Sequence, residues 1–167
     1  MQQHQLINQD SGNTEYYTPS GIIEAARLVM GGIDLDPASS AVANQRVQAT
    51  RFFCAEDDAL TVPWNGRVWM NHPFSRENNP RFVRKLIEEY TSGRVSSACC
   101  ITFAATSEAW FRPLLAHPQC YIYGRTNYYL PDGTLKKGVS KGSVVTYLGD
   151  NEKAFREVFK QLGAVKV

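Results

Sequence analysis

Four consecutive residues, Asn71-His72-Pro73-Phe74, follow the apolar run at residues 68–70 and combine an amide, a restrained backbone and an aromatic ring. The amide oxygen can accept hydrogen bonds, and Pro73 fixes its own φ and pushes His72 towards an extended conformation. An aromatic ring stacks on any base and stabilises it by about 1–3 kcal/mol. The spacing predicts a site for a flat, nitrogen-bearing substrate at the tip of a strand. An ordinary turn is the alternative that these four residues leave open.

A nucleobase amine that accepts a methyl group needs such a site. Its lone pair is delocalised into the ring, so carbonyl oxygens must accept its N–H protons and favour a more pyramidal nitrogen. The side-chain oxygen of Asn71 supplies one acceptor, the next backbone carbonyl supplies a second, and Phe74 stacks on the base. Direct transfer to a neutral amine needs no strong base, so we interpret His72 as a polar loop residue and keep a general base as the alternative.

Further motifs precede these residues in a characteristic order. They are Tyr16-Tyr17-Thr18-Pro19, then Gly31-Gly32-Ile33-Asp34-Leu35-Asp36-Pro37-Ala38-Ser39-Ser40, then Ala55-Glu56-Asp57-Asp58-Ala59-Leu60 and Trp64. With Asn-x-Pro-Phe, this succession resembles the amino-methyltransferases that use S-adenosylmethionine. It is most similar to the small phage and prophage DNA adenine-N6 methyltransferases of the Dam-like kind, whose pattern runs Tyr-Thr-Pro, Leu-Asp-Pro-Ala-Ser, Glu-Asp-Asp-x-Leu, Trp, Asn-Pro-Pro-Tyr. The resemblance extends over residues 15–148, and the ordered set is specific.

The resemblance implies an adenine-specific DNA methyltransferase that acts on double-stranded DNA with S-adenosylmethionine as cofactor. Its catalytic residues would be Asn71, His72, Pro73 and Phe74. His72 departs from the family's Pro, although a His can still contribute its main-chain carbonyl. Two alternatives stay open: a catalytically impaired relative that binds DNA and cofactor, and a methyltransferase for another planar amine in RNA, a nucleotide or a protein glutamine.

The resemblance also implies which residues hold the cofactor. The turn after the first strand would cradle its methionine part, and an acidic residue of the third motif would meet its adenine. The segment at residues 36–39 could equally be the end of a strand followed by a capped helix. The implied cofactor residues are Tyr17, Thr18, Pro19, Asp34, Asp36, Pro37, Ala38, Ser39, Asp57 and Asp58.

A basic loop at residues 124–142 joins the last two predicted strands. It carries four basic residues and one acidic residue, a local charge of +3, beside two tyrosines. This pattern favours contacts with phosphates and with an extruded base, and a solvated hairpin is the alternative. The predicted DNA-binding residues are Arg76, Arg125, Tyr128, Tyr129, Lys136, Lys137 and Lys141.

The composition fits one soluble domain. The chain has 167 residues, 43% of them hydrophobic, and a net charge of +2, which neither demands nor excludes nucleic acid. Its four cysteines show no Cys-x-x-Cys spacing, so we predict no metal site. The polar amino terminus lacks the features of a signal peptide, and no apolar run reaches membrane-spanning length. We therefore expect no membrane partner and a cytoplasmic protein, and the resemblance to phage enzymes implies that the cytoplasm is that of a bacterial host cell.

Strand and helix patterns alternate along the chain. We expect a flexible arm at residues 1–14 and a single methyltransferase domain at residues 15–167. Its α/β fold would be Rossmann-like, with a mostly parallel sheet and helices on both faces, so that Asp36, Asp58 and Asn71 meet at the carboxyl ends of the strands. Thr18 and Pro19 would start the first helix with a capping hydroxyl. Strands are predicted at residues 33–36, 52–53, 68–71, 98–103, 119–123 and 143–148, and helices up to residue 30, from 79, after 107 and over 151–162.

Overall fold

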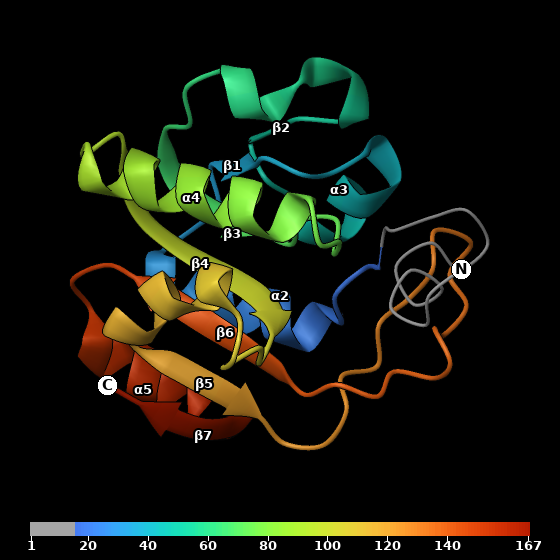
Figure 1. The fold of residues 1–167 in the computed structure, drawn as a ribbon, viewed down its shortest axis with the longest axis vertical. Coiled ribbons are helices and arrows are strands. Elements are labelled where there is room, and N and C mark those ends of the chain that lie inside the picture. The colour runs from blue at the N-terminus through green and yellow to red at the C-terminus, as the bar shows by residue number, and fades with distance from the viewer. Residues whose placement is uncertain (1–15) are drawn as a thin grey trace.

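The computed structural model describes residues 16–167, so the predicted arm at residues 1–14 lies outside the described part of the chain. Seven strands form one sheet in the order β2-β1-β3-β4-β6-β5-β7 (Figure 1). The strands are β1 (Leu35–Asp36), β2 (Arg51–Phe52), β3 (Gly66–Met70), β4 (Val95–Phe103), β5 (Gln119–Ile122), β6 (Ser143–Leu148) and β7 (Gly163–Lys166).

The sheet is mixed. Strands β2, β1, β3 and β4 pair in parallel, whereas the pairings of β4 with β6, of β6 with β5 and of β5 with β7 are antiparallel. The predicted mostly parallel sheet is therefore found only in the first half. For β5 and β6 the connection gives a physical reason: a loop without a helix joins them, whereas neighbouring parallel strands are usually joined by a crossover helix.

Helices cover both faces of the sheet, as the alternating pattern predicts (Figure 1). The α-helices are α2 (Ser20–Met30), α3 (Ala41–Val47), α4 (Asn78–Thr91) and α5 (Glu152–Phe159), and the 3₁₀ segments are η2 (Ala55–Asp57), η3 (Ala59–Thr61) and η4 (Ala109–Ala116). The helix predicted after residue 107 is the 3₁₀ segment η4. It contains Pro113, which lacks the N–H that an α-helix would need there.

The core has two halves, one on each face. Val68 and Met70 of β3 pack on the side of α4 and η4, while the intervening Trp69 packs on the side of α2 and α5. Residues of β4 alternate in the same way, because successive side chains of a strand point to opposite faces. All of these side chains are buried, so the central strands are held firmly from both sides.

The strand order reverses between β1 and β3. From β1 the chain moves outward to β2, and it then returns to β3 on the other side of β1. In α/β sheets, ligands bind outside the carboxyl ends of the strands at this reversal. Asp36 is the last residue of β1, and Asn71 comes directly after β3. The fold therefore brings these two side chains to the place where a ligand is expected.

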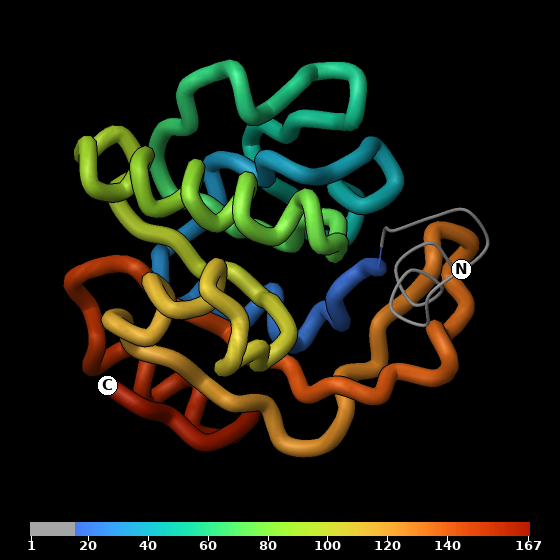
Figure 2. The backbone as a smooth tube through the Cα atoms, in the orientation of Figure 1, coloured from blue at the N-terminus to red at the C-terminus, as the bar shows by residue number. Residues whose placement is uncertain are grey.

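The basic loop runs out from the sheet and passes beside the first residues that the structure describes (Figure 2). Tyr17 and Tyr129 form an antiparallel bridge there, with N–H to carbonyl distances of 2.7 and 2.9 Å. Leu135 pairs with Tyr129 on the opposite side. In residues 16–167, no helix has the length and apolar character needed to cross a membrane.

Candidate active site

A cavity opens over the carboxyl ends of β1 and β3, at the strand reversal. It collects most of the residues that the motifs predict, from segments that are far apart in the chain. The predicted residues that line it are Tyr17, Thr18, Asp36, Pro37, Ala38, Ser39, Asp58, Asn71, His72 and Pro73. The structure thus joins the Tyr-Thr-Pro, Asp-Pro-Ala-Ser, Asp-Asp and Asn-x-Pro motifs around one space.

The amide of Asn71 has a defined orientation. Its Nδ2 donates to the main-chain oxygen of Tyr16 at 2.6 Å and to Oγ1 of Thr18 at 3.0 Å. A carbonyl oxygen can only accept, so the nitrogen of the amide must face Tyr16. The Asn71 oxygen is on the other branch of the amide and keeps its acceptor capacity for a ligand in the cavity, as the chemistry of an amine substrate requires.

Asp36 is a buried carboxylate without a cationic partner in the described part of the chain. Only 2% of its surface is exposed, and its Oδ1 accepts from the N–H of Ala38 at 3.1 Å. Burial raises the pKa of Asp36 to about 7, against the smaller opposing effects of Ala38 and the Ser39 hydroxyl. A cationic group in the cavity would stabilise the ionised form.

The turn that follows Asp36 leads into a capped helix. The Ser40 hydroxyl accepts from the N–H of Ala43 at 3.0 Å and so caps α3. The sequence left open whether these residues form a ligand turn or a capped helix. In the structure they form a capped helix and also line the cavity.

His72 is in the loop after β3 and is one of the residues that line the cavity, but its side chain is buried. Its ring is buried, stacks on Phe82 at 5.6 Å between centroids and touches Phe74 edge-on. Nε2 lies 2.8 Å from Oδ1 of Asn79, which can only accept, so Nε2 carries the proton. Burial lowers the pKa of His72 to about 4, despite the Asn79 bond. The imidazole is therefore neutral near pH 7 and a weak base.

Two aromatic side chains predicted to touch the base are buried elsewhere. Phe74 is 2% exposed and packs 4.7 Å from Phe103, between ring centroids, while Tyr128 is fully buried and shares a 2.8 Å hydrogen bond with the Ser143 hydroxyl. Neither residue lines the cavity. Phe74 packs on His72 and Tyr128 packs on Tyr16, and these two neighbours line the cavity. Phe74, Phe103, Tyr128 and Tyr16 form an aromatic cluster, and Phe74 and Tyr128 would have to leave it to stack on a base.

Three predicted cofactor residues do not reach the cavity. Asp34 lies before β1 and forms a salt bridge of 2.8 Å with Arg67, whose hydrogen bonds lower the pKa of Asp34 to about 2. Asp57 accepts from the main-chain N–H of Cys54 at 2.7 Å and so closes the turn η2. Pro19 is the N-cap of α2. These residues build the scaffold, and we leave them out of the proposed site.

Several residues around the cavity were not predicted from the sequence. Arg46 and Cys54 reach it from the end of α3 and from the end of β2, where no familiar motif marks them. Phe82 and Arg81 come from the start of α4; the helical spacing of Phe82 indicates only packing, and no motif marks Arg81. Periodicity identifies a buried face, but it does not show which end of that face borders a ligand site.

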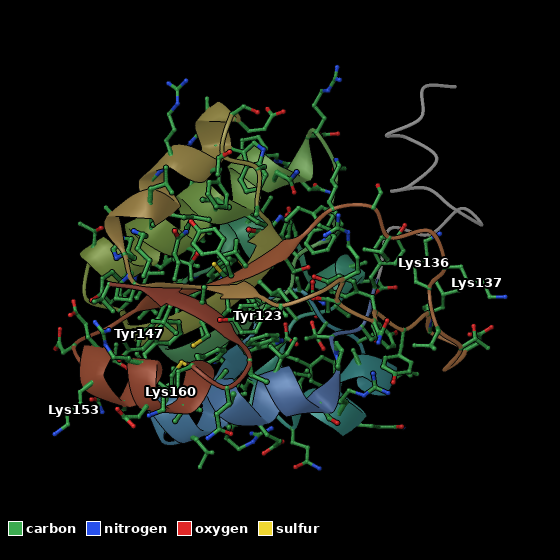
Figure 3. All side chains as sticks on the ribbon, turned by 90° about the horizontal axis from the view of Figure 1, so that it is seen from below. Tyr123, Lys136, Lys137, Tyr147, Lys153 and Lys160 are labelled. Atoms are coloured by element: carbon green, nitrogen blue, oxygen red, sulfur yellow. The ribbon has the colours of Figure 1, made fainter. Side chains whose placement is uncertain are left out.

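The basic loop presents cations to solvent. Arg125, Lys137 and Lys141 are exposed, as is Arg76 after the Asn-x-Pro motif. Figure 3 shows Lys136 and Lys137 together at one end of the molecule, with Lys153 of α5 and Lys160, the C-cap of α5, at the other end. The ammonium of Lys141 lies 5.5 Å from the ring centroid of Phe103, next to the aromatic cluster. The loop therefore presents exposed positive charge, and Lys141 places part of it beside the aromatic cluster.

Among residues 16–167, no three His, Cys, Asp or Glu side chains cluster in a way that could hold a metal ion. The sequence matches the model of a protein family described as DNA N-6-adenine-methyltransferase (Dam) over residues 7–157, which is most of the chain. A search of curated proteins found no match to this chain.

Proposed function

Because the chain belongs to the DNA N-6-adenine-methyltransferase (Dam) family, it is a DNA adenine-N6 methyltransferase, and we propose how its site performs the transfer. The methyl donor is S-adenosylmethionine, and the acceptor is an adenine turned out of a DNA duplex into the cavity. The adenine must leave the duplex because its N6 is otherwise paired and stacked. The parallel arrangement of β2, β1, β3 and β4 supports a Rossmann-like methyltransferase fold.

The observation that carries this proposal is the orientation of the Asn71 amide. Its nitrogen is bound to Tyr16 and Thr18, and its oxygen is left to accept from a substrate N–H. The main-chain carbonyl of His72 is the second acceptor in this account. Two acceptors on N6 oppose the delocalisation of its lone pair and become stronger partners as the nitrogen gains positive charge.

The cavity suits a cationic cofactor. S-adenosylmethionine supplies a methyl group bound to a positively charged sulfur, and it also carries an ammonium group. Asp36 provides a buried carboxylate at the end of β1 with no cation beside it among the described residues. Asp58 also lines this cavity, in the motif expected to meet the adenosine end. These two carboxylates would bind and orient the donor.

The site needs no side-chain base. The transfer would move the methyl group from sulfur to the N6 lone pair, with the electron pair of the carbon–sulfur bond left on sulfur. The methylated N6 would be positively charged and would still hold both of its protons, one of which is then acidic enough to leave for solvent. His72 is neutral, buried and bonded to Asn79, so its role is to support the loop through packing. The packed imidazole can hold the loop in place where the family has Pro. This packing argues against the alternative that the chain is a catalytically impaired relative.

Transfer of tritium from labelled S-adenosylmethionine tests the reaction. We expect label in duplex DNA and its recovery as N6-methyl-2′-deoxyadenosine after nucleoside digestion. Parallel reactions with RNA, free nucleotide and protein decide between DNA and the other planar amines. Label in one of those substrates and none in DNA would overturn the proposal.

Asn71→Ala tests the residue that carries the proposal. We expect kcat to fall by about 100-fold or more, because an interaction that strengthens in the transition state is lost. Cofactor affinity, measured by calorimetry, should stay nearly unchanged. Asn151→Ala is the matched control, since Asn151 caps α5 far along the chain from the cavity and its loss should leave kcat intact. An Asn71→Ala protein with full turnover would remove the amide from the mechanism.

The basic loop is tested through the salt dependence of DNA binding. Replacing Lys137 and Lys141 by Gln should weaken binding similarly for all duplex sequences and reduce the salt slope by about 0.9 per lost phosphate contact. Replacing Lys153 and Lys160 by Gln removes the same charge from the opposite end of the molecule (Figure 3). Equal effects of the two pairs would mean that the loop is not a specific DNA surface.

A further inference from the structure

Thr18 uses its hydroxyl in an unexpected way. The residue is buried at 2% exposure and stands just before α2, where the sequence predicts a helix cap. That prediction is wrong: the N-cap is Pro19, with no side-chain cap bond. The Thr18 hydroxyl instead accepts from Nδ2 of Asn71 at 3.0 Å. A residue expected to start a helix, or to touch the cofactor, thus contacts the substrate-binding amide.

The segment at residues 16–18 is fixed on several sides. The main chain of Tyr17 exchanges two hydrogen bonds with Tyr129 of the basic loop. The Tyr17 hydroxyl lies 3.2 Å from Oγ of Ser40, in the turn after β1 at residues 36–40, here called the cofactor turn. Arg46 donates to the Thr18 carbonyl at 3.4 Å and places its guanidinium 4.6 Å from the ring centroid of Tyr129. The segment therefore touches the catalytic amide, the cofactor turn and the basic loop together.

We propose that Thr18 is a positioning residue for methyl transfer, which aims the Asn71 oxygen at the substrate and is itself held in place by the basic loop through Tyr17. The inference rests on the proposed role of Asn71. The terminal torsion of Asn has a broad energy profile, so hydrogen bonds to its nitrogen decide where its oxygen points. Tyr16 supplies one such bond and Thr18 the other. Contact of DNA with the basic loop would then act on a segment that touches the catalytic amide.

Thr18→Val and Thr18→Ser separate the hydroxyl from the shape of the side chain. Val keeps the branched shape and loses the acceptor, so we expect kcat to fall by about fivefold, the factor that one typical hydrogen bond represents. KM for DNA and for cofactor should change less than twofold. Ser keeps the hydroxyl and should restore kcat. A Val variant with the wild-type kcat, or a Ser variant as slow as Val, would overturn the proposal.

Thr146→Val is the matched control. Thr146 is buried in β6, and its Oγ1 accepts from the side-chain amide of Gln119 at 3.1 Å, the same kind of contact away from the cavity. Its loss should lower the melting temperature and leave kcat unchanged. An equal fall in kcat for Thr146→Val would mean that general loosening explains the result, which contradicts a positioning role. If Thr18→Val does not fold by circular dichroism, Thr18→Ala takes its place.

A second measurement does not depend on activity. The side-chain N–H signals of Asn71 can be assigned in nuclear magnetic resonance spectra of the ¹⁵N-labelled protein by their loss in Asn71→Ala. We expect slow exchange of these protons with solvent in the wild type and in Thr18→Ser, and faster exchange in Thr18→Val. Equal exchange in all three overturns the Thr18 inference. A wild type that makes no N6-methyladenine refutes the proposed function instead, and the two failures are therefore distinguishable.

Discussion

Two carboxylates, two residues apart, occupy opposite electrostatic environments. Asp34 precedes β1 and receives three N–H groups of Arg67, whereas Asp36 ends β1 and receives the N–H of Ala38 in a buried setting. The Arg67 bonds lower the pKa of Asp34 to about 2, and burial raises the pKa of Asp36 to about 7. At the amino ends of the strands, here called the amino edge of the sheet, the charge of Asp34 is neutralised by Arg67. At the carboxyl ends of the strands, here called the carboxyl edge, Asp36 has no neighbouring cation among the described residues, and its ionised form is unfavourable. Such a perturbed group in a cavity indicates a binding site.

The sharpest test of this comparison is Asp36→Asn. The amide keeps the size of the side chain and removes the charge, so we expect S-adenosylmethionine to bind about 10- to 100-fold more weakly, as for loss of a charge-assisted hydrogen bond. Folding should not suffer at neutral pH, because the substitution also removes a buried charge without a cation beside it among the described residues. Calorimetry and thermal melts measure both effects. Unchanged affinity would contradict a cofactor role for the carboxyl edge.

The same carboxylate gives a pH dependence that the variant should abolish. Because the folded pKa of Asp36 is about 7, the empty site is mostly protonated at pH 5 and must lose that proton to bind a cation. Cofactor affinity should therefore rise by about tenfold per pH unit below pH 7 and level off above it. The stability of the empty protein has the opposite sign: the contribution of Asp36 is full below its unfolded pKa, near 4, and is lost as pH rises to 7.

Asp34→Asn tests the amino edge and should have the smaller effect. The pair with Arg67 is 36% exposed on each side, so solvent screening limits the expected loss of unfolding free energy to about 1 kcal/mol. Cofactor affinity should stay as in the wild type. Because the pKa of Asp34 is lowered, its contribution is present above pH 4 and disappears as pH falls through about 2. A large loss of cofactor affinity in this variant would erase the distinction between the two edges.

The sequence predicts much of the scaffold because its signals are local. The apolar run at residues 143–148 coincides with β6, and the glycine pair after residue 30 ends α2 with Gly31 in a left-handed conformation, φ 78°. Strand β7, at Gly163–Lys166, was not predicted because it is short and only its first residue is buried. Local patterns fail where a short segment depends on its neighbour in the sheet for its structure.

The candidate site is less predictable because long-range partners decide its roles. Asp34 and Asp36 look equivalent in the sequence until Arg67, 33 residues after Asp34, binds one of them. Phe74 reads as a base-stacking residue, but Phe103 and Tyr128 enclose it. The motifs place residues of several segments around one cavity. They do not show which motif residues face it and which of them support it.

His72→Pro changes a residue at the carboxyl edge, and among these variants we expect it to alter the reaction rate least. The substitution restores the family's residue and stiffens the loop, so we expect kcat to stay near the wild-type value or to rise. Stability should fall by about 1–2 kcal/mol, because the ring loses its packing on Phe82 and leaves Asn79 without its partner. The pKa of His72 is about 4, so kcat at saturating cofactor should show no histidine step between about pH 6 and 7 in either protein. Rates across this range, with circular dichroism to confirm folding, check the prediction. A folded His72→Pro protein that is inactive would show that the imidazole contacts the substrate, and the carboxyl edge would then contain a second functional side chain beside Asn71.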